Sequence, residues 1–279
     1  MTVRIVTDST CDLPANVVER LGITVVPLTV FFGNEALLDG VEIDSQTFYD
    51  RLKSAPALPR SSQPSVDLFQ EAYERLSADG SEIVSIHLSS KMSGTLNAAS
   101  VAREVMKDSA HIDLIDSYQV SLGLGLIVME AALAAQAGKG LAEVVAAARR
   151  AMDSSGVYLL VDTLEFLRRG GRIGRASSFL GSILSIKPIV HIEDGEVAPV
   201  ERVRTRAKAI ERIFQLALQH PRSKTLFVAH GGDVAAAGAL IERLRPALPH
   251  TEIMIAEFGP AVGVHTGPGT LGIAYLERE

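Results

Sequence analysis

Apolar residues along the first half of the chain form short runs rich in β-branched side chains, and stretches with helical periodicity separate these runs. Such alternation predicts parallel strands joined by crossover helices. The pattern places strands at residues 4–7, 23–32, 83–88 and 111–115. Because Pro27 has no N–H group it weakens the second strand, and turn signals at Gly33-Asn34 and Asp39-Gly40 predict a small hairpin excursion near residues 30–45.

Helix starts are marked by Ser65, Thr205 and Asp233, each of which stands before a segment predicted to be helical. Their side-chain oxygens can accept a hydrogen bond from an N–H group of the first turn. Residues 54–64 are rich in proline and serine, and residues 259–272 contain five glycines, so both segments are predicted to be loops.

The second half of the chain shows a different order of elements. Asp194-Gly195 is a strong hairpin signal between strands predicted at residues 186–192 and 197–203. The best boundary lies at residues 154–156. The predicted fold class is therefore α/β with two domains: residues 1–155 with a mostly parallel sheet and flanking helices, and residues 156–279 with a mixed sheet.

The most apolar stretch covers residues 120–137 and contains Glu130 and Gln136. A membrane span needs about 20 mostly apolar residues. We therefore interpret this stretch as a buried helix, and we expect at most transient membrane contact.

Composition narrows the classes of function. The chain has 27 Lys and Arg against 33 Asp and Glu, a net charge of −6, which argues against general nucleic-acid binding. Cys11 is the single cysteine, so no internal disulfide can form. The start of the sequence lacks the pattern of a secretory signal, and a cytoplasmic location is expected.

A serine-rich loop between a predicted strand and a predicted helix is the most informative local feature. It ends in Ser93-Gly94-Thr95. Free N–H groups at a helix start, together with a serine hydroxyl, form a site for an anion, and glycine lets a ligand approach the backbone. A simple helix cap at Ser93 or Thr95 would have the same sequence signature.

Two further segments carry polar groups suited to an anion. Ser61 and Ser62 lie in a hydroxyl-rich loop before Pro64, and His265 lies among glycines that leave room for a ligand. An ordinary surface loop is the alternative for both segments.

Arginines are concentrated in two stretches of this acidic chain. Guanidinium groups bind oxyanions through paired hydrogen bonds, which favours an anionic partner surface or a phosphate, while a solvated charged face remains the alternative. The basic residues are Arg168, Arg169, Arg172, Arg175, Arg202, Arg204, Arg206 and Lys208.

Signatures of nucleotide-hydrolysing enzymes, dinucleotide binding and zinc proteases are absent from the sequence, and so is the Gly-x-Ser-x-Gly nucleophile elbow. The seven histidines are scattered without the spacing of a metal site. No metal or other cofactor is expected.

Six segments together resemble the DegV family in order and spacing, over essentially the whole chain. They are residues 6–14, 61–65, 88–95, 116–117, 167–173 and 265–269. The resemblance implies a two-domain α/β protein that encloses a long-chain fatty acid between its domains. In bacteria that have the pathway, such proteins serve phospholipid synthesis as the binding subunit of fatty acid kinase.

By this resemblance Ser93 and the backbone of Gly94 would bind the fatty-acid carboxylate, and His265 would complete the site. The family usually has threonine where this chain has Ser61, so Ser61 keeps the hydroxyl and loses a methyl group, with Ser62 as its neighbour. Arg172 and Arg202 are similar to basic residues expected near the mouth that faces a separate ATP-dependent kinase.

Other interpretations remain open at the level of the sequence. Apolar runs at residues 122–129 and 179–186 would line a tunnel or simply form core. A serine-dependent acyl hydrolase would use Ser93 as nucleophile, His265 as base and Asp8 or Asp116 as the orienting carboxylate. A third hypothesis is a regulatory module that binds a phosphorylated small molecule at Gly94 and the arginines.

Overall fold

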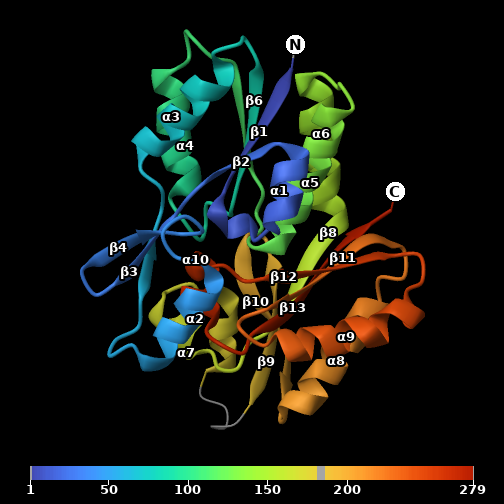
Figure 1. The fold of residues 1–279 in the computed structure, drawn as a ribbon. Coiled ribbons are helices and arrows are strands. Elements are labelled where there is room, and N and C mark those ends of the chain that lie inside the picture. Colours follow the sequence, from blue (N-terminus) through green and yellow to red (C-terminus); the bar gives the residue numbers. More distant parts are fainter. Residues whose placement is uncertain (1, 181–185, 279) are drawn as a thin grey trace.

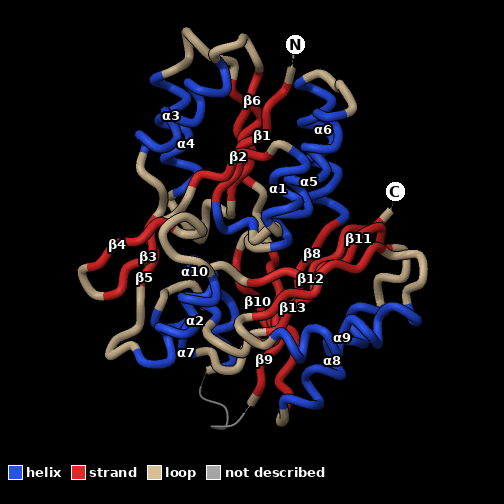
Figure 2. The backbone as a smooth tube through the Cα atoms, viewed as in Figure 1, coloured by secondary structure: helices blue, strands red, loops and turns tan. Residues whose placement is uncertain are grey.

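Two β-sheets with flanking helices make up the computed structural model, which describes residues 2–180 and 186–278 (Figures 1 and 2). In the view of Figure 1 the N-terminal sheet lies above the C-terminal sheet, and a small antiparallel sheet projects to one side. Part of the apolar run at 179–186 lies outside the described residues.

The N-terminal sheet has four strands in the order β2-β1-β6-β7, and every pair is parallel. This confirms the predicted parallel arrangement, and it brings the carboxyl ends of the strands to one edge. The strands are β1 (Val3–Asp8), β2 (Ile23–Val26), β6 (Glu82–His87) and β7 (Ile112–Asp116). Their helices are α1 (Ala15–Leu21), α3 (Val66–Ser77), α4 (Thr95–Val105), α5 (Leu122–Gln136) and α6 (Leu141–Ser154), with a short 3-10 turn η1 (Ser9–Cys11).

The C-terminal sheet has six strands in the order β10-β9-β8-β13-β11-β12. It is mixed, as predicted, because β11 and β12 run parallel while the other neighbours are antiparallel. The strands are β8 (Ser155–Leu160), β9 (Lys187–Glu193), β10 (Glu196–Val203), β11 (Ser223–His230), β12 (Glu252–Glu257) and β13 (Leu271–Glu277). The accompanying helices are α7 (Glu165–Arg169), η2 (Gly174–Phe179), α8 (Arg206–Leu218) and α9 (Val234–Ala247).

The three predicted helix caps are present. Ser65 Oγ accepts from the N–H of Leu68 at 3.3 Å, and Thr205 Oγ1 accepts from Lys208 N–H at 3.4 Å. Asp233 Oδ1 accepts from the N–H of Ala236 at 3.1 Å. Each bond satisfies an N–H group that the helix itself leaves free.

The strand predicted at residues 23–32 is two strands in two different sheets. The chain turns at Pro27 and Leu28, whose N–H donates to Ser9 Oγ at 3.0 Å instead of to a strand. β3 (Thr29–Phe32) then pairs with β4 (Glu35–Leu38) in the predicted hairpin and with β5 (Arg60–Ser62). β5 corrects the prediction of an unbroken loop at residues 54–64. Between β4 and β5 lies α2 (Ser45–Ser54).

The prediction of a glycine-rich loop at residues 259–272 is also wrong, because it contains the helix α10 (Pro260–Thr266). Pro260 occupies the first helical turn, where its missing N–H costs nothing. Gly263 allows α10 to pack directly on α2, since a Cβ atom there would lie 2.6 Å from Phe48 and 2.9 Å from the Tyr49 hydroxyl. Tertiary packing thus favours a helix where local composition favours a loop.

The largest buried cluster contains side chains from both large sheets and from α5. α5 confirms the helix predicted in the most apolar stretch, and no helix within residues 2–180 and 186–278 is long and apolar enough to cross a membrane. Cys11 lies under α5, where Gly125 comes so close that a Cβ atom would be 2.6 Å from the Cys11 carbonyl oxygen. The division at residue 155 stays a prediction.

Candidate functional site

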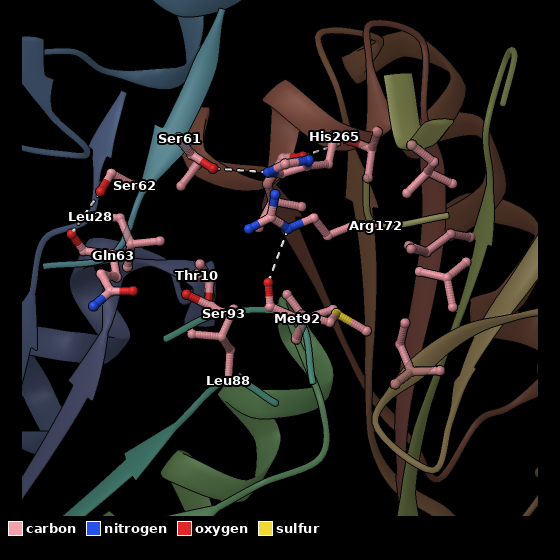
Figure 3. Close-up of a pocket in the computed structure, with 18 residues that line it drawn as sticks. Thr10, Leu28, Ser61, Ser62, Gln63, Leu88, Met92, Ser93, Arg172 and His265 are labelled. Atoms are coloured by element: carbon pink, nitrogen blue, oxygen red, sulfur yellow. Dashed lines mark hydrogen bonds between the residues drawn. The ribbon is translucent and has the colours of Figure 1, made fainter. Parts of the chain in front are cut away.

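A narrow cavity lies between the loops at the carboxyl edge of the N-terminal sheet, the C-terminal sheet and α10 (Figure 3). It encloses about 640 Å³ of space free of protein atoms, including its open mouth. Most of its wall is apolar and comes from both halves of the chain, as Leu28, Leu88, Leu159, Ile192 and Val262 illustrate. Its polar side chains are Thr10, Ser61, Ser62, Gln63, Ser93, Arg172, His265 and Thr266.

Four of the five residues predicted to bind the carboxylate line this cavity, namely Ser61, Ser62, Ser93 and His265. Ser61 comes from β5, Ser93 from the loop before α4 and His265 from α10 (Figure 3). The Oγ atom of Ser61 lies 2.8 Å from His265 Nε2, within hydrogen-bond distance, although 204 positions separate the two residues. The cavity therefore joins segments from opposite ends of the sequence.

His265 is neutral at neutral pH. Burial, reinforced by the positive charge of Arg172, lowers the pKa of its imidazole from 6.5 to about 4. Its other nitrogen, Nδ1, is buried without a hydrogen-bond partner in the part of the chain that the structure describes. The ring packs against Gly170, where a Cβ atom would lie 2.2 Å from Nδ1. One glycine of the arginine-glycine segment thus makes room for the ring.

Ser93 lies one residue before Gly94, the N-cap of α4, and lines the cavity. Its Oγ atom accepts from the N–H of Thr95 at 3.3 Å and lies 2.9 Å from the Thr95 hydroxyl. The first turn of α4 directs its positive dipole end toward the same place. The helix-cap alternative for Ser93 is wrong, because Gly94 is the N-cap and no side chain caps α4. The anion site at Ser93 stays a prediction, and the hydroxyl lies at the wall of the cavity.

Gln63 is a cavity residue that the sequence analysis missed. A Cβ atom on Gly94 would lie 2.0 Å from Gln63 Oε1, so the absence of a side chain at Gly94 is what lets the amide lie there. Ser62 is exposed and its hydroxyl donates to the Gln63 carbonyl oxygen at 3.4 Å. The position of Gln63 directly after the two serines was the available signal.

The two basic residues expected at the mouth lie in different places. Arg172 lines the cavity, where its Nε donates to the Met92 carbonyl at 3.0 Å and its Nη1 donates to the Gly170 carbonyl at 2.7 Å (Figure 3). Arg202 does not line the cavity. Its guanidinium lies 4.5 Å from the centre of the Phe179 ring and donates to the Ser178 carbonyl at 3.0 Å.

The remaining arginines do not form one anion-binding surface, because carboxylates lie between them. Arg168 and Arg169 both pair with Glu165. Arg175 pairs with Glu193 and Asp194, and Arg206 pairs with Asp162 and Asp233. This arrangement is closer to the solvated charged face that was the alternative.

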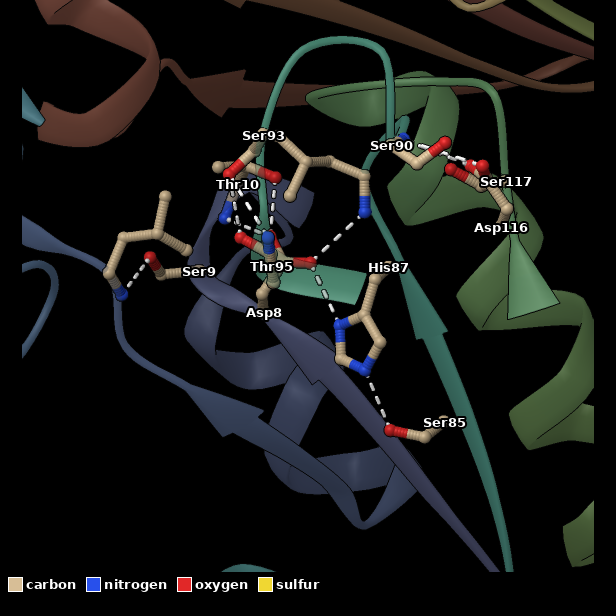
Figure 4. A network of polar contacts seen from close by, with 12 residues as sticks. Asp8, Ser9, Thr10, Ser85, His87, Ser90, Ser93, Thr95, Asp116 and Ser117 are labelled. Carbon is tan, nitrogen blue, oxygen red and sulfur yellow. Dashed lines mark hydrogen bonds and ion pairs between the residues drawn. The ribbon is translucent and has the colours of Figure 1, made fainter. Parts of the chain in front are cut away.

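A buried polar network stands beside the cavity (Figure 4). Asp8 accepts from His87 Nδ1 and from the Leu88 N–H, both at 3.0 Å, and from the Thr10 hydroxyl at 2.5 Å. His87 Nε2 lies 2.7 Å from the Ser85 hydroxyl. All of these side chains are buried, so the network fixes Thr10 and the start of the serine-rich loop in the cavity wall.

The hydrolase hypothesis requires a carboxylate on His265, and none contacts it among residues 2–180 and 186–278. Asp8 serves His87, and Asp116 accepts from the N–H groups of Ser90 and Tyr118. His265 contacts the hydroxyl of Ser61 rather than that of Ser93. The described residues also contain no group of three His, Cys, Asp or Glu side chains that could hold a metal ion.

Comparison with known proteins gives a consistent result. The family model DegV, described as "Uncharacterised protein, DegV family", matches residues 2–278. A DegV domain-containing protein of Streptomyces coelicolor is 40% identical over 280 residues, which cover 99% of both chains.

Solved structures share the whole fold. A fatty-acid-binding DegV family protein from Thermus thermophilus has a TM-score of 0.90 and 35% identity, with full coverage of both chains. DegV of Bacillus subtilis, a fatty acid binding protein, has a TM-score of 0.90 and 33% identity, again with full coverage. At 20% identity, the fatty acid kinase B3 protein of Streptococcus pneumoniae, loaded with linoleic acid, shows the same fold with a TM-score of 0.85 over the full length of both chains.

Proposed function

Because the chain belongs to the DegV family, we propose that it binds a long-chain fatty acid in the cavity of Figure 3 and holds the carboxylate at its polar end. The observation that carries this proposal is the convergence of Ser61, Ser93 and His265 on one mostly apolar cavity. The fatty-acid-binding relatives from Thermus thermophilus and Bacillus subtilis support it.

The apolar wall supplies the affinity. About 14 methylene groups buried at roughly 0.8 kcal/mol each give on the order of 11 kcal/mol before the costs of ordering are subtracted. The wall side chains come from both halves of the chain, so the tail would lie between them.

The polar end supplies the hydrogen bonds that a buried carboxylate requires. A neutral imidazole carries one N–H. When His265 Nε2 donates to Ser61 Oγ, the Ser61 hydroxyl proton is free to donate to the ligand. The Ser93 hydroxyl and the N–H groups around Gly94 provide the second set of donors, and Ser62 also lines the cavity.

Extraction of bound lipid tests the proposal directly. Protein purified from cells should release a fatty acid detectable by mass spectrometry. Ser93→Ala with His265→Ala should weaken palmitate binding about 100-fold, because the first change removes a hydroxyl donor and the second removes the imidazole that orients the Ser61 hydroxyl. Ser65→Ala removes a hydroxyl that only caps α3 and serves as the control. The absence of both lipid and palmitate uptake would refute the proposal.

We further propose that the bound carboxylate is presented to a separate ATP-dependent kinase that forms the acyl-phosphate. In this proposal the carrier needs no catalytic residue or cofactor of its own, and we expect it in the cytoplasm, where ATP is available. Arg172 would act at the cavity mouth and Arg202 on the surface that the kinase contacts.

A reconstituted kinase assay separates these roles. Arg202→Ala should lower the rate of acyl-phosphate formation and leave palmitate affinity unchanged, because Arg202 does not line the cavity. Arg172→Ala should lower both quantities. Full acyl-phosphate formation with Arg202→Ala would exclude that residue from the kinase contact.

A further inference from the structure

The first turn of α10 is held by two carboxylates from the N-terminal half of the chain. α10 has seven residues, and Gly259, the residue before it, offers no side chain as a cap. Asp12 Oδ1 instead accepts from the Gly259 N–H at 2.9 Å, and Asp39 Oδ2 accepts from the Ala261 N–H at 3.3 Å. Both donors belong to the end of a helix that has no acceptor of its own for them.

Each carboxylate is in turn fixed by a serine. The hydroxyl of Ser121 donates to Asp12 Oδ2 at 2.5 Å, and that of Ser9 donates to Asp39 Oδ2 at 2.7 Å. Asp12 and Asp39 are 8% and 4% exposed, so neither side chain can turn away without leaving an unpaired polar group in the interior.

Glycine at position 259 makes this arrangement possible. A Cβ atom there would lie 2.9 Å from Asp12 Oδ1 and 3.5 Å from Asp39 Oδ1. The two carboxylates therefore flank the same short piece of backbone, and together they fix its position from two directions.

The arrangement is unfavourable for the carboxylates themselves. Burial, with added repulsion from Asp8, raises the pKa of Asp39 to about 7 and the pKa of Asp12 well above its ordinary range. Simple capping needs no buried acid, because an exposed serine or aspartate caps a helix equally well.

The other end of α10 carries His265, one helical turn beyond Ala261. Because α10 is short and stiff, a shift of its first turn also moves the imidazole. The 2.8 Å distance between His265 Nε2 and Ser61 Oγ leaves little tolerance, since a hydrogen bond is lost when its atoms separate by more than a few tenths of an ångström beyond 3.2 Å.

We propose that Asp12 and Asp39 are positioning residues that act through α10 to set His265 against Ser61, and thereby control the head-group site from the far side of the helix. This inference rests on the proposed fatty-acid binding. The two side chains work as acceptors in a fixed place and do not touch the ligand.

Two ligands with the same tail distinguish positioning of the head-group site from general support of the cavity. Asp12→Ala and Asp39→Ala should each weaken palmitate binding about tenfold and change hexadecanol binding less than about twofold, because the alcohol lacks the carboxylate that His265 serves. Added to His265→Ala, either substitution should cause no further loss, as expected for groups that act through one another.

Conservative variants and a matched control complete the experiment. Asp12→Asn and Asp39→Asn keep an acceptor oxygen and should bind palmitate within about threefold of the unaltered protein. Asp44→Ala removes a carboxylate that caps α2 by accepting from the Thr47 N–H at 2.7 Å and should not change the ratio of the two affinities. Equal losses for palmitate and hexadecanol, or losses that add to that of His265→Ala, would overturn the inference.

NMR of the His265 imidazole tests the inference even if the alanine variants fold poorly. It also tests the inference independently of the proposed function, because it needs no ligand. In ligand-free protein, the imidazole ¹⁵N resonances of His265 should change in Asp39→Asn less than in Gly259→Ala, which wedges the carboxylates apart. Failure of the unaltered protein to bind palmitate refutes the proposed function alone, whereas unchanged His265 resonances in Gly259→Ala refute the positioning.

Discussion

The two sides of α10 differ in charge. One side faces the cavity, where hydroxyls, Arg172 and a neutral His265 offer hydrogen-bond donors. The other side borders a groove whose described lining contains Asp12, Glu19, Asp39, Asp44 and Glu257 and no Lys or Arg. A single short helix thus separates a wall rich in hydrogen-bond donors from a groove rich in carboxyl groups.

The comparison teaches that burial acts in opposite directions on acids and bases. On the cavity side burial lowers the pKa of His265, and on the groove side it raises the pKa of Asp39. Both shifts favour the neutral form of the group. His265 and Asp39 are therefore both neutral at moderately acidic pH, and Asp39 becomes charged above pH 7.

A substitution of Asp39, on the groove side, should produce the largest change in the free energy of unfolding. Burial raises the pKa of Asp39 to about 7, and Asp8 and Asp12 are its neighbouring carboxyl groups. Protonated Asp39 therefore stabilises the fold. This stabilisation is complete below the pKa of the unfolded chain and is lost as the pH rises through 7. Asp39→Asn should remove up to about 4 kcal/mol of the fall in unfolding free energy between pH 4 and pH 8. Urea denaturation across this range measures it, and parallel curves for both proteins would contradict it.

On the cavity side, His265 should make the free energy of unfolding depend on pH in the opposite direction. The pKa of His265 is lowered to about 4, so its contribution to stability is present above about pH 6.5 and is lost as the pH falls through 4. His265→Gln should remove about 3 kcal/mol of the loss between pH 7 and pH 4. Chemical denaturation of ligand-free protein at the two pH values measures it, and an unaltered acid limb in the variant would show that the imidazole is already charged in the fold.

The packing of α10 on α2 should produce an intermediate effect. Gly263→Ala places a methyl group 2.6 Å from the fully buried Phe48 ring and should destabilise the protein by about 2 kcal/mol. Gly238→Ala in α9 is the control, because nothing lies within 4 Å of its added methyl group and helix propensity should stabilise it by about 1 kcal/mol. Thermal unfolding distinguishes them, and equal shifts in Tm would contradict the close contact.

Substitutions at two other glycines should produce the smallest effects, and these effects are on palmitate affinity. Gly170→Ala directs a methyl group at His265 Nδ1 and is also blocked by the Phe166 carbonyl at 3.1 Å, so the imidazole must move and palmitate affinity should fall about tenfold. Gly94→Ala meets only the exposed Gln63 side chain, which can turn away, so the loss should stay near threefold. Competition with a fluorescent fatty acid measures both, and a larger loss at Gly94 would reverse the order.

Local sequence signals predicted local structure well. Ser65, Thr205 and Asp233 marked helix starts because a cap depends on residues only three positions apart. The sequence did not predict α10, since Gly263 weakens a helix locally and is needed for contact with Phe48, which is distant in the chain. Packing against residues distant in the sequence therefore determines that this segment is a helix.

The site followed from the sequence only in part. Spacing indicated an anion site near Ser93, and the family resemblance added Ser61 and His265, which no local rule would pair across 204 positions. Asp39 was interpreted only as part of a turn signal, and Asp12 only as part of the segment 6–14. What their side chains hold was missed, because both partners lie at the start of α10, far away in the sequence.

The single cysteine has a practical consequence. Cys11 is 3% exposed under α5, and burial raises the pKa of its thiol, so little reactive thiolate forms near neutral pH. A maleimide dye should therefore leave the natural protein unlabelled and mark one engineered thiol selectively. Val234→Cys, at a 61% exposed position on the rim of the groove, would place such a reporter without first removing the native thiol.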